Sequence, residues 1–140
     1  MAVFHFATDY FAIDVSGTPV DLSTYVKGIT INAKRIELDA SAAGDVGISR
    51  VAGLWDWSME LEVYNDFAAS KVDATLFAII GVEGTVSFRP TSAAQSATNP
   101  TYAGEGIVFD YPLTLRHGEM AMVNFTIMGS DGAAMTRTAT

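Results

Sequence analysis

Residues 54–64 read Leu-Trp-Asp-Trp-Ser-Met-Glu-Leu-Glu-Val-Tyr, and this stretch decides the fold class. Its odd positions from 55 to 63 are apolar, whereas its even positions from 56 to 62 carry Asp, Ser, Glu and Glu. Successive side chains of a β-strand point to opposite faces of a sheet. The period of two therefore predicts a strand with one buried apolar face and one acidic face.

The same patterning, with Gly, Pro, Asn and Asp between segments, extends over most of the chain. We expect strands at residues 10–15, 28–39 and 85–89 as well. Residues 90–101 are typical of a loop, and Gly104 and Gly106 of turns. Apolar residues then occupy every second position in two segments, 107–115 and 121–127, so that each segment has one apolar face. This predicts a late hairpin with Pro112 at a bulge or an edge.

Residues 66–80 break the alternation with Ala-rich spacing, and Gly81 is placed to end a helix in a left-handed turn. We expect the only substantial helix there. Residues 40–49 lack apolar bulk and contain Gly44 and Gly47, so this loop should project from the domain. The predicted fold is mainly β: an antiparallel β-sandwich or barrel with one flanking α-helix and a long projecting loop.

Length and charge narrow the function classes. With 140 residues, 49% of them hydrophobic, the chain is expected to form one domain spanning residues 1–140. The formal net charge of −8 argues against a basic nucleic-acid-binding surface. The chain has no cysteine, which excludes disulfides, thiolate nucleophiles and thiolate metal sites. The first fifteen residues lack the pattern of a signal peptide or a spanning helix, so we expect a soluble, unexported protein.

Few residues suggest chemistry. His5 and His117 have no second ligand at a metal-binding spacing, and no serine lies in a nucleophile elbow. Glu60 and Glu62 would project from one strand face about 7 Å apart, a spacing that acid-base catalysis can use. Acids are also ordinary on the polar face of a sheet. We therefore predict no enzymatic activity, no metal and no cofactor, and keep an enzyme using these two acids as an alternative.

Apolar residues suggest assembly. The mean hydropathy is +0.26 and only 17% of the residues are charged. Met120, Met122 and Met128 alternate with Val123 and Phe125, so both faces of this segment are expected to be covered. Two other readings stay open: a sandwich with unusually complete internal packing, and a monomeric β-sandwich binding module that uses Trp55 and Tyr102.

The order of landmarks resembles the major tail tube proteins of long-tailed, non-contractile bacteriophages of siphovirus type. It begins with Phe-Ala-Ile-Asp at 11–14 and Gly-Thr-Pro-Val-Asp-Leu-Ser-Thr-Tyr-Val at 17–26, followed by Val-Ala-Gly-Leu at 51–54. Val-Asp-Ala-Thr-Leu at 72–76, leading to Gly81, and Asn-Pro-Thr-Tyr-Ala-Gly-Glu at 99–105 complete it. Neither of the two most telling passages, Asp-Leu-Ser-x-Tyr-Val and Asn-Pro-x-Tyr-x-Gly-Glu, is a catalytic motif. The resemblance spans roughly residues 10–129.

The resemblance implies a structural virion protein, six copies of which close into a ring around a channel that conducts viral DNA. Lumen-facing candidates are Asp56, Ser58, Glu60, Glu62, Thr30, Asn32, Thr114, Asn124 and Thr126. The inter-ring loop would comprise Ala40, Ser41, Ala42, Ala43, Gly44, Asp45, Val46, Gly47, Ile48 and Ser49, with residues 1–9 and 130–140 as terminal arms. A carboxylate-lined lumen would repel phosphates, so DNA would pass without binding.

The resemblance also implies partners. Lys34 and Arg116 are expected in inter-subunit ion pairs that fix the register. Stacked hexameric rings would meet tape measure, tail terminator and baseplate or tip proteins. No membrane partner is expected, and the protein would occur in the virion and, during assembly, in the host cytoplasm. A tube subunit of a contractile tail or of a secretion machine is the nearest alternative.

Overall fold

A computed structural model describes residues 6–15, 17 and 19–140, so His5 lies outside the described residues. Within them, nine strands form one antiparallel sheet in the order β2-β1-β5-β6-β8-β4-β3, with β7 on β8 and β9 on β6. A 3-10 turn, Ser23–Tyr25, and one α-helix, α1 (Val72–Ala78), complete the elements. The strands are β1 (Tyr10–Asp14), β2 (Pro19–Asp21), β3 (Val26–Asp39), β4 (Arg50–Tyr64), β5 (Glu83–Arg89), β6 (Thr101–Val108), β7 (Leu113–Thr114), β8 (Met122–Gly129) and β9 (Thr136–Thr138).

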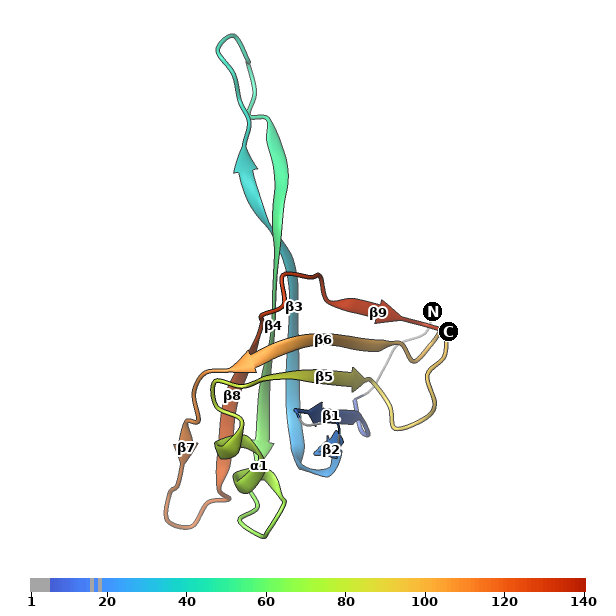
Figure 1. The fold of residues 1–140 in the computed structure, drawn as a ribbon, viewed down its shortest axis with the longest axis vertical. Helices are drawn as coiled ribbons and strands as arrows, with labels where there is room; N and C mark the ends of the chain where they lie inside the picture. The colour runs from blue at the N-terminus through green and yellow to red at the C-terminus, as the bar shows by residue number, and fades with distance from the viewer. Residues whose placement is uncertain (1–5, 16, 18) are drawn as a thin grey trace.

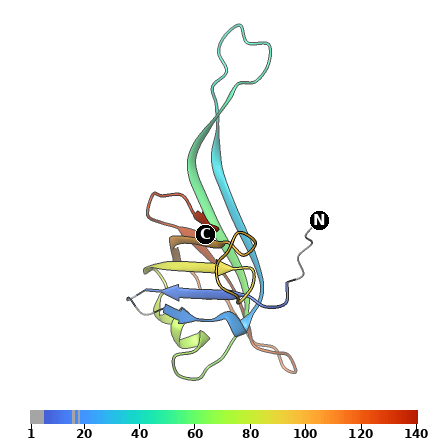
Figure 2. The same cartoon turned by 90° about the vertical axis from the view of Figure 1, so that its right-hand side faces the viewer.

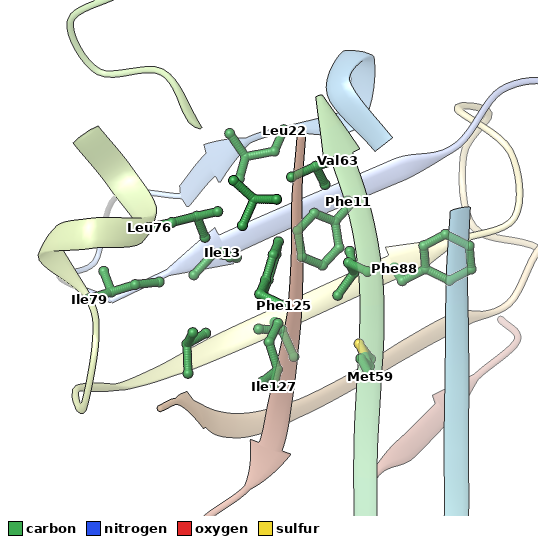
Figure 3. Packing of buried hydrophobic residues seen from close by; sticks show 14 of the residues in the cluster. Phe11, Ile13, Leu22, Met59, Val63, Leu76, Ile79, Phe88, Phe125 and Ile127 are labelled. Carbon is green, nitrogen blue, oxygen red and sulfur yellow. The ribbon is translucent and has the colours of Figure 1, made fainter. Parts of the chain in front are cut away.

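The sheet folds over on itself into two layers. One layer contains β2, β1, β5 and β6, and it crosses the other, formed by β8, β4 and β3 (Figure 1). Pairing of β6 with β8 joins the layers at one side. The core lies between them and beneath α1, as Figure 3 shows, and its largest fully buried side chains include Trp57, Phe11, Phe125, Leu22, Met59, Leu61, Leu76 and Ile127. The predicted mainly-β fold with one flanking helix is confirmed.

The β3–β4 hairpin extends far beyond the two layers (Figures 1 and 2). We call residues 36–54 the arm; the predicted loop 40–49 forms its tip. Short bonds close that tip: Ala40 N–H donates to the Ser49 carbonyl at 2.8 Å, and Ser49 N–H donates to Ser41 Oγ at 2.8 Å. The tip is exposed throughout. The expected projection of this loop is therefore confirmed.

The helix is shorter than predicted. It covers Val72–Ala78 instead of residues 66–80. Asp66 accepts a hydrogen bond from Ala68 N–H at 2.9 Å, and Ser70 has a φ of 61°, so residues 66–71 form turns instead of helix. Gly81 does have the expected left-handed backbone, with a φ of 78°.

Strand β6 contradicts the assignment of Gly104 and Gly106 to turns. Both glycines lie inside this strand, which pairs with β5 from Glu83↔Ile107 to Phe88↔Tyr102. The expected shared apolar face from 107 to 115 is also wrong: β6 ends at Val108, which is 3% exposed, whereas Phe109 is 62% exposed. The late hairpin itself is present, because Leu113 pairs with Val123.

Trp55 was expected in the buried face together with Trp57. The structure buries Trp57 at 2% exposure but leaves Trp55 45% exposed. The alternation of β4 continues past the edge of the two layers, so Trp55 has no opposing layer to cover it.

Candidate functional site

One face of β3, β4 and β8 carries the polar residues that alternation predicted. Directly paired residues of antiparallel strands share a face. The pairs Thr30↔Glu60↔Thr126 run across the three strands, and Glu62 pairs with Asn124. The register places all nine lumen candidates on this face, since Asn32 pairs with Ser58, Lys34 with Asp56, and Thr114 of β7 with Met122 of β8.

The opposite face of the same strands is core. Met59, Leu61 and Val63 of β4 are at most 1% exposed, and Val123, Phe125 and Ile127 of β8 are at most 2% exposed. A slip of one residue would exchange the two faces, so core burial fixes which side the acids occupy. Met122 and Met128 lie on the polar face, and Met128 is 43% exposed. Within this chain alone, the expected covering of both faces of β8 is incomplete.

Charge on this polar face is mainly negative. Asp56, Glu60 and Glu62 are exposed. Lys34 Nζ lies 3.8 Å from Asp56 Oδ2, and both side chains are largely solvated, so this pair contributes little stability. In the described part of the chain, Glu60 and Glu62 form no ion pair. The face thus keeps unneutralised carboxylates at its centre.

The centre of the face is slightly hollowed. A shallow, open depression of about 440 Å³ is lined by β3, β4 and β8, with Glu60, Glu62, Asn124 and Thr126 among its lining residues. Asn32 Nδ2 donates to Ser58 Oγ at 3.4 Å beside it. Carboxylates, amides and hydroxyls offer water many hydrogen bonds, and the residues that line the depression include no Lys or Arg to hold a phosphate.

The two glutamates lie on this open, solvated face instead of in an apolar pocket. Acid-base catalysis needs surroundings that separate the roles of two carboxyl groups. Glu60 and Glu62 share the open depression with Thr30, Asn124 and Thr126, and neither carboxylate is enclosed by it. Among residues 6–15, 17 and 19–140, no group of three or more His, Asp or Glu side chains could hold a metal ion. His117 is exposed in the β7–β8 turn.

The remaining candidates lie elsewhere. Arg116 is exposed next to β7 and, within the described residues, forms no ion pair. Lys34 already has an intrachain partner in Asp56. That each of these two cations forms an ion pair with another subunit stays a prediction. Tyr102 packs against the core and Trp55 lies at the base of the arm, beneath Arg35.

Sequence patterns missed two features. Gly104, Gly106 and Gly129 surround the buried indole of Trp57, a role that nothing local to those glycines indicates. Apolar side chains also line one face of the arm, which was expected only to be a small-residue loop on two strands. The described residues contain no helix of the length and apolarity needed to cross a membrane.

Several solved structures have a similar fold over almost the whole length of this chain. The SPP1 tail tube matches with a TM-score of 0.71, covering 95% of this chain and 77% of that chain at 8% identity. The chain has the tail tube fold. No protein-family model and no curated protein matches its sequence.

Two further structures share this tail tube fold. The tail of an empty gene transfer agent particle, solved with C6 symmetry, gives a TM-score of 0.64 at 12% identity over 93% of this chain and 95% of that one. The six-fold symmetrised baseplate of the anti-feeding prophage gives 0.60 at 9% identity over 99% and 98%. The predicted absence of enzymatic activity agrees with these neighbours, which are a tail, a tail tube and a baseplate.

Proposed function

We propose that this chain is the tail tube subunit of a bacteriophage of siphovirus type, and that six copies close into rings that stack into a tube. The observation that carries this proposal is the placement of all nine polar candidates on one face of β3, β4, β7 and β8, directly opposite the core. The tail tube fold and the six-fold symmetry stated for two similar assemblies support it.

In this tube the polar face lines the channel. Glu60, Glu62 and Asp56 repel DNA phosphates, and the Thr, Ser and Asn side chains between them hold a layer of water. Repulsion keeps the polyanion away from the wall, so no residue binds it strongly enough to arrest it. Negative charge is then the mechanism of conduction.

Ring closure uses the two sides of this sheet. β3 is the last strand on one side, and the short β7 lies beyond β8 on the other. Unpaired strand edges invite uncontrolled association, and joining the β3 side of one copy to the β7 side of the next removes them. Lys34 of β3 and Arg116 after β7 lie near these two sides. Each would form an ion pair with a carboxylate of the neighbouring copy, and these pairs would set the register between copies.

Ring stacking uses the loop at residues 40–49 and the terminal arms at 1–9 and 130–140. Within the C-terminal segment 130–140, Thr136–Thr138 form β9 and pair with β6, so this part is held by its own subunit. The finished tube meets a tape measure protein inside it and terminator and baseplate or tip proteins at its ends. The subunit assembles in the host cytoplasm and functions in the virion.

Electron microscopy of the purified protein tests the proposal. Hollow rings or tubes with six subunits per turn are the expected result. A protein that stays strictly monomeric at high concentration would contradict it and would favour the binding-module reading with Trp55 and Tyr102.

A tube subunit of a contractile tail or secretion machine is the second candidate. The fold shared with the anti-feeding prophage baseplate over 99% of this chain favours keeping it. Both candidates predict rings. Particles carrying a contractile sheath around this tube would support the second candidate, and bare tubes the first.

A further inference from the structure

Asp9 is an acidic residue at the edge of the core. It directly precedes β1, and the alternation of this strand places it on the same face as Phe11 and Ile13, which point into the core (Figure 3). Its burial agrees with this placement, because Asp9 is only 8% exposed. Its Oδ2 is buried and has no hydrogen-bond partner within the described residues. The proposed tube gives this side chain no role.

The charged group that faces Asp9 from β2 is another acid, Asp21. Its negative charge opposes ionisation of Asp9. Asp21 is fixed in place, since its Oδ1 accepts a hydrogen bond from Ser23 N–H at 2.9 Å. Ser23 Oγ in turn accepts a hydrogen bond from Phe11 N–H at 2.9 Å, so the turn after Asp21 is bonded to β1. Moving Asp21 away from Asp9 would break these bonds.

No cation of the described residues neutralises Asp9. Neither of the two ion pairs in this part of the chain includes it. The cation on the strand beside β1 is Arg89 of β5, which pairs directly with Tyr10 and so lies on the face opposite Asp9. The Arg89 guanidinium lies 4.0 Å from the centre of the Tyr10 ring, and its Nε–H donates to the Ala93 carbonyl at 3.1 Å. Arg89 is therefore already engaged elsewhere.

Ionisation of Asp9 places an unpaired carboxylate in a buried site beside a fixed negative charge. Burial, and then the charge of Asp21, raise the pKa of Asp9 from 3.8 to about 6 in the folded chain. Outside this site, in water, the group ionises with its ordinary pKa. Between these two pKa values, each rise of one pH unit makes departure of Asp9 from its site about tenfold more favourable. Above about pH 6 there is no further gain.

Asp9 can leave its site without unfolding the sheet. Residues 6–9, which we call the N-terminal segment, belong to no strand. One contact that holds this segment is the Phe6 ring on Phe88, with centroids 6.4 Å apart, and Phe6 stays 38% exposed. Chain ends open locally at little cost in free energy, whereas core strands open only with the whole fold.

We infer that Asp9 is a proton-controlled switch for the N-terminal segment: protonated Asp9 stays in its site and keeps residues 6–9 packed, whereas ionised Asp9 leaves it and releases them. β1 stays in the sheet in both states, because it pairs with β2 on one side and β5 on the other. The switch belongs to the single subunit and so goes beyond the proposed function. In the proposed tube, it would set the pH above which the arm at residues 1–9 is released by its own subunit.

A spin label on the N-terminal segment tests this switch in the purified full-length chain. The chain has no cysteine and Ala7 is exposed, so Ala7→Cys gives a single labelling site. The nitroxide spectrum should be broad at pH 4, and its narrow, mobile component should grow at least about fivefold by pH 7.5. A label at Ala43→Cys, in the exposed arm tip, is the control and should give the same spectrum at both pH values. Equal spectra of the Ala7 label at pH 4 and pH 7.5 would overturn the inference.

Variants of the two acids identify the group responsible. Asp9→Asn cannot ionise, so the Ala7 label in this variant should stay broad at both pH values; a large mobile component at pH 7.5 would overturn the inference. Asp21→Asn keeps an acceptor for Ser23 N–H but removes the opposing charge, so it should reduce the change without abolishing it, since burial is the larger cause. Asp110→Asn, at an exposed position, should keep the full change. Failure here would leave the tube proposal standing, because electron microscopy tests rings and tubes separately.

Discussion

The indole ring of Trp57 occupies the space that a side chain on Gly104 would need. A Cβ on Gly104 would lie 2.6 Å from Trp57 Cζ2, and one on Gly106 would lie 3.2 Å from Cη2. Gly129 of β8 lies against the same ring, and the buried indole N–H has no hydrogen-bond partner within the described residues. Trp57 thus fits where β4, β6 and β8 meet, and glycines on the other two strands make room for it.

Gly104→Ala should destabilise the fold. The new methyl group would displace Trp57, and overpacking a dense core costs about 1–3 kcal/mol. Urea unfolding followed by Trp fluorescence measures the loss. Gly47→Ala is the control, because nothing lies within 4 Å of a Cβ there and its change should stay within about 0.5 kcal/mol. Equal stability of the two variants would show that the Trp57 site is loosely packed.

Reversal of the two central carboxylates should slow DNA passage without preventing assembly. Glu60→Lys with Glu62→Lys replaces repulsion of phosphates by attraction at the middle of the polar face. Both side chains are exposed, so folding should be nearly unchanged. DNA ejection from particles carrying this tube is expected to be retarded, and more strongly at low salt, because salt screens the attraction.

A matched charge change outside the channel controls for net charge. Asp110→Lys with Glu119→Lys makes the same change at exposed loop positions outside strands β3, β4 and β8. Ejection through this tube should match that of the unaltered tube. Unchanged ejection through the Glu60 and Glu62 variant would contradict the assignment of this face to the lumen.

Asp9 should make stability fall as pH rises. Burial, and then the charge of Asp21, raise its pKa from 3.8 to about 6. A raised folded-state pKa means that the native state binds the proton more tightly, so its stabilisation is complete below pH 3.8 and is lost as pH rises through about 6. Screening by solvent reduces the effect, so we expect a loss of about 1–2 kcal/mol from this group.

Asp9→Asn removes the titration. Urea midpoints of this variant should change less between pH 4 and pH 7 than those of the unaltered chain, with the variant the more stable at pH 7. Asp110→Asn, at an exposed position, is the control and should keep the original pH dependence. Parallel curves for the unaltered chain and Asp9→Asn would show that Asp9 carries no such penalty.

Local patterning predicted the polar face of the sheet but not where the two packed layers end. The alternation of residues 54–64 correctly placed Asp56, Glu60 and Glu62 on the face opposite the core, because the period of the strand and burial of its apolar side together fix the two faces. The same alternation placed Trp55 in the core, since a local pattern cannot show where the opposing layer ends. The same pattern gave no sign of the bulge in β4, where Gly53 and Leu54 lie between the pairs Arg35↔Trp55 and Glu37↔Ala52, because a bulge appears only in the register.

Long-range packing explains the other differences. Gly104 and Gly106 were assigned to turns because glycine is common there. In the structure they lie in a strand, and the ring of Trp57, almost fifty residues earlier, fills the space that larger side chains would occupy. The helix was overextended because an Ala-rich stretch favours helix, whereas the Asp66 side chain bonds to the Ala68 amide and to the Tyr25 hydroxyl, holding turns in place.

Asn99→Ala should loosen the loop between β5 and β6. The Asn99 side chain is buried; its Oδ1 accepts from Thr91 N–H at 3.0 Å and its Nδ2 donates to the Ala93 carbonyl at 2.9 Å. Truncation leaves backbone groups of the loop unpaired, which costs about 1–3 kcal/mol. Hydrogen exchange should show faster exchange in residues 90–100, and urea unfolding a lower midpoint. Ser92→Ala, exposed on the same loop, should change neither; equal exchange in both variants would mean that Asn99 does not hold this loop.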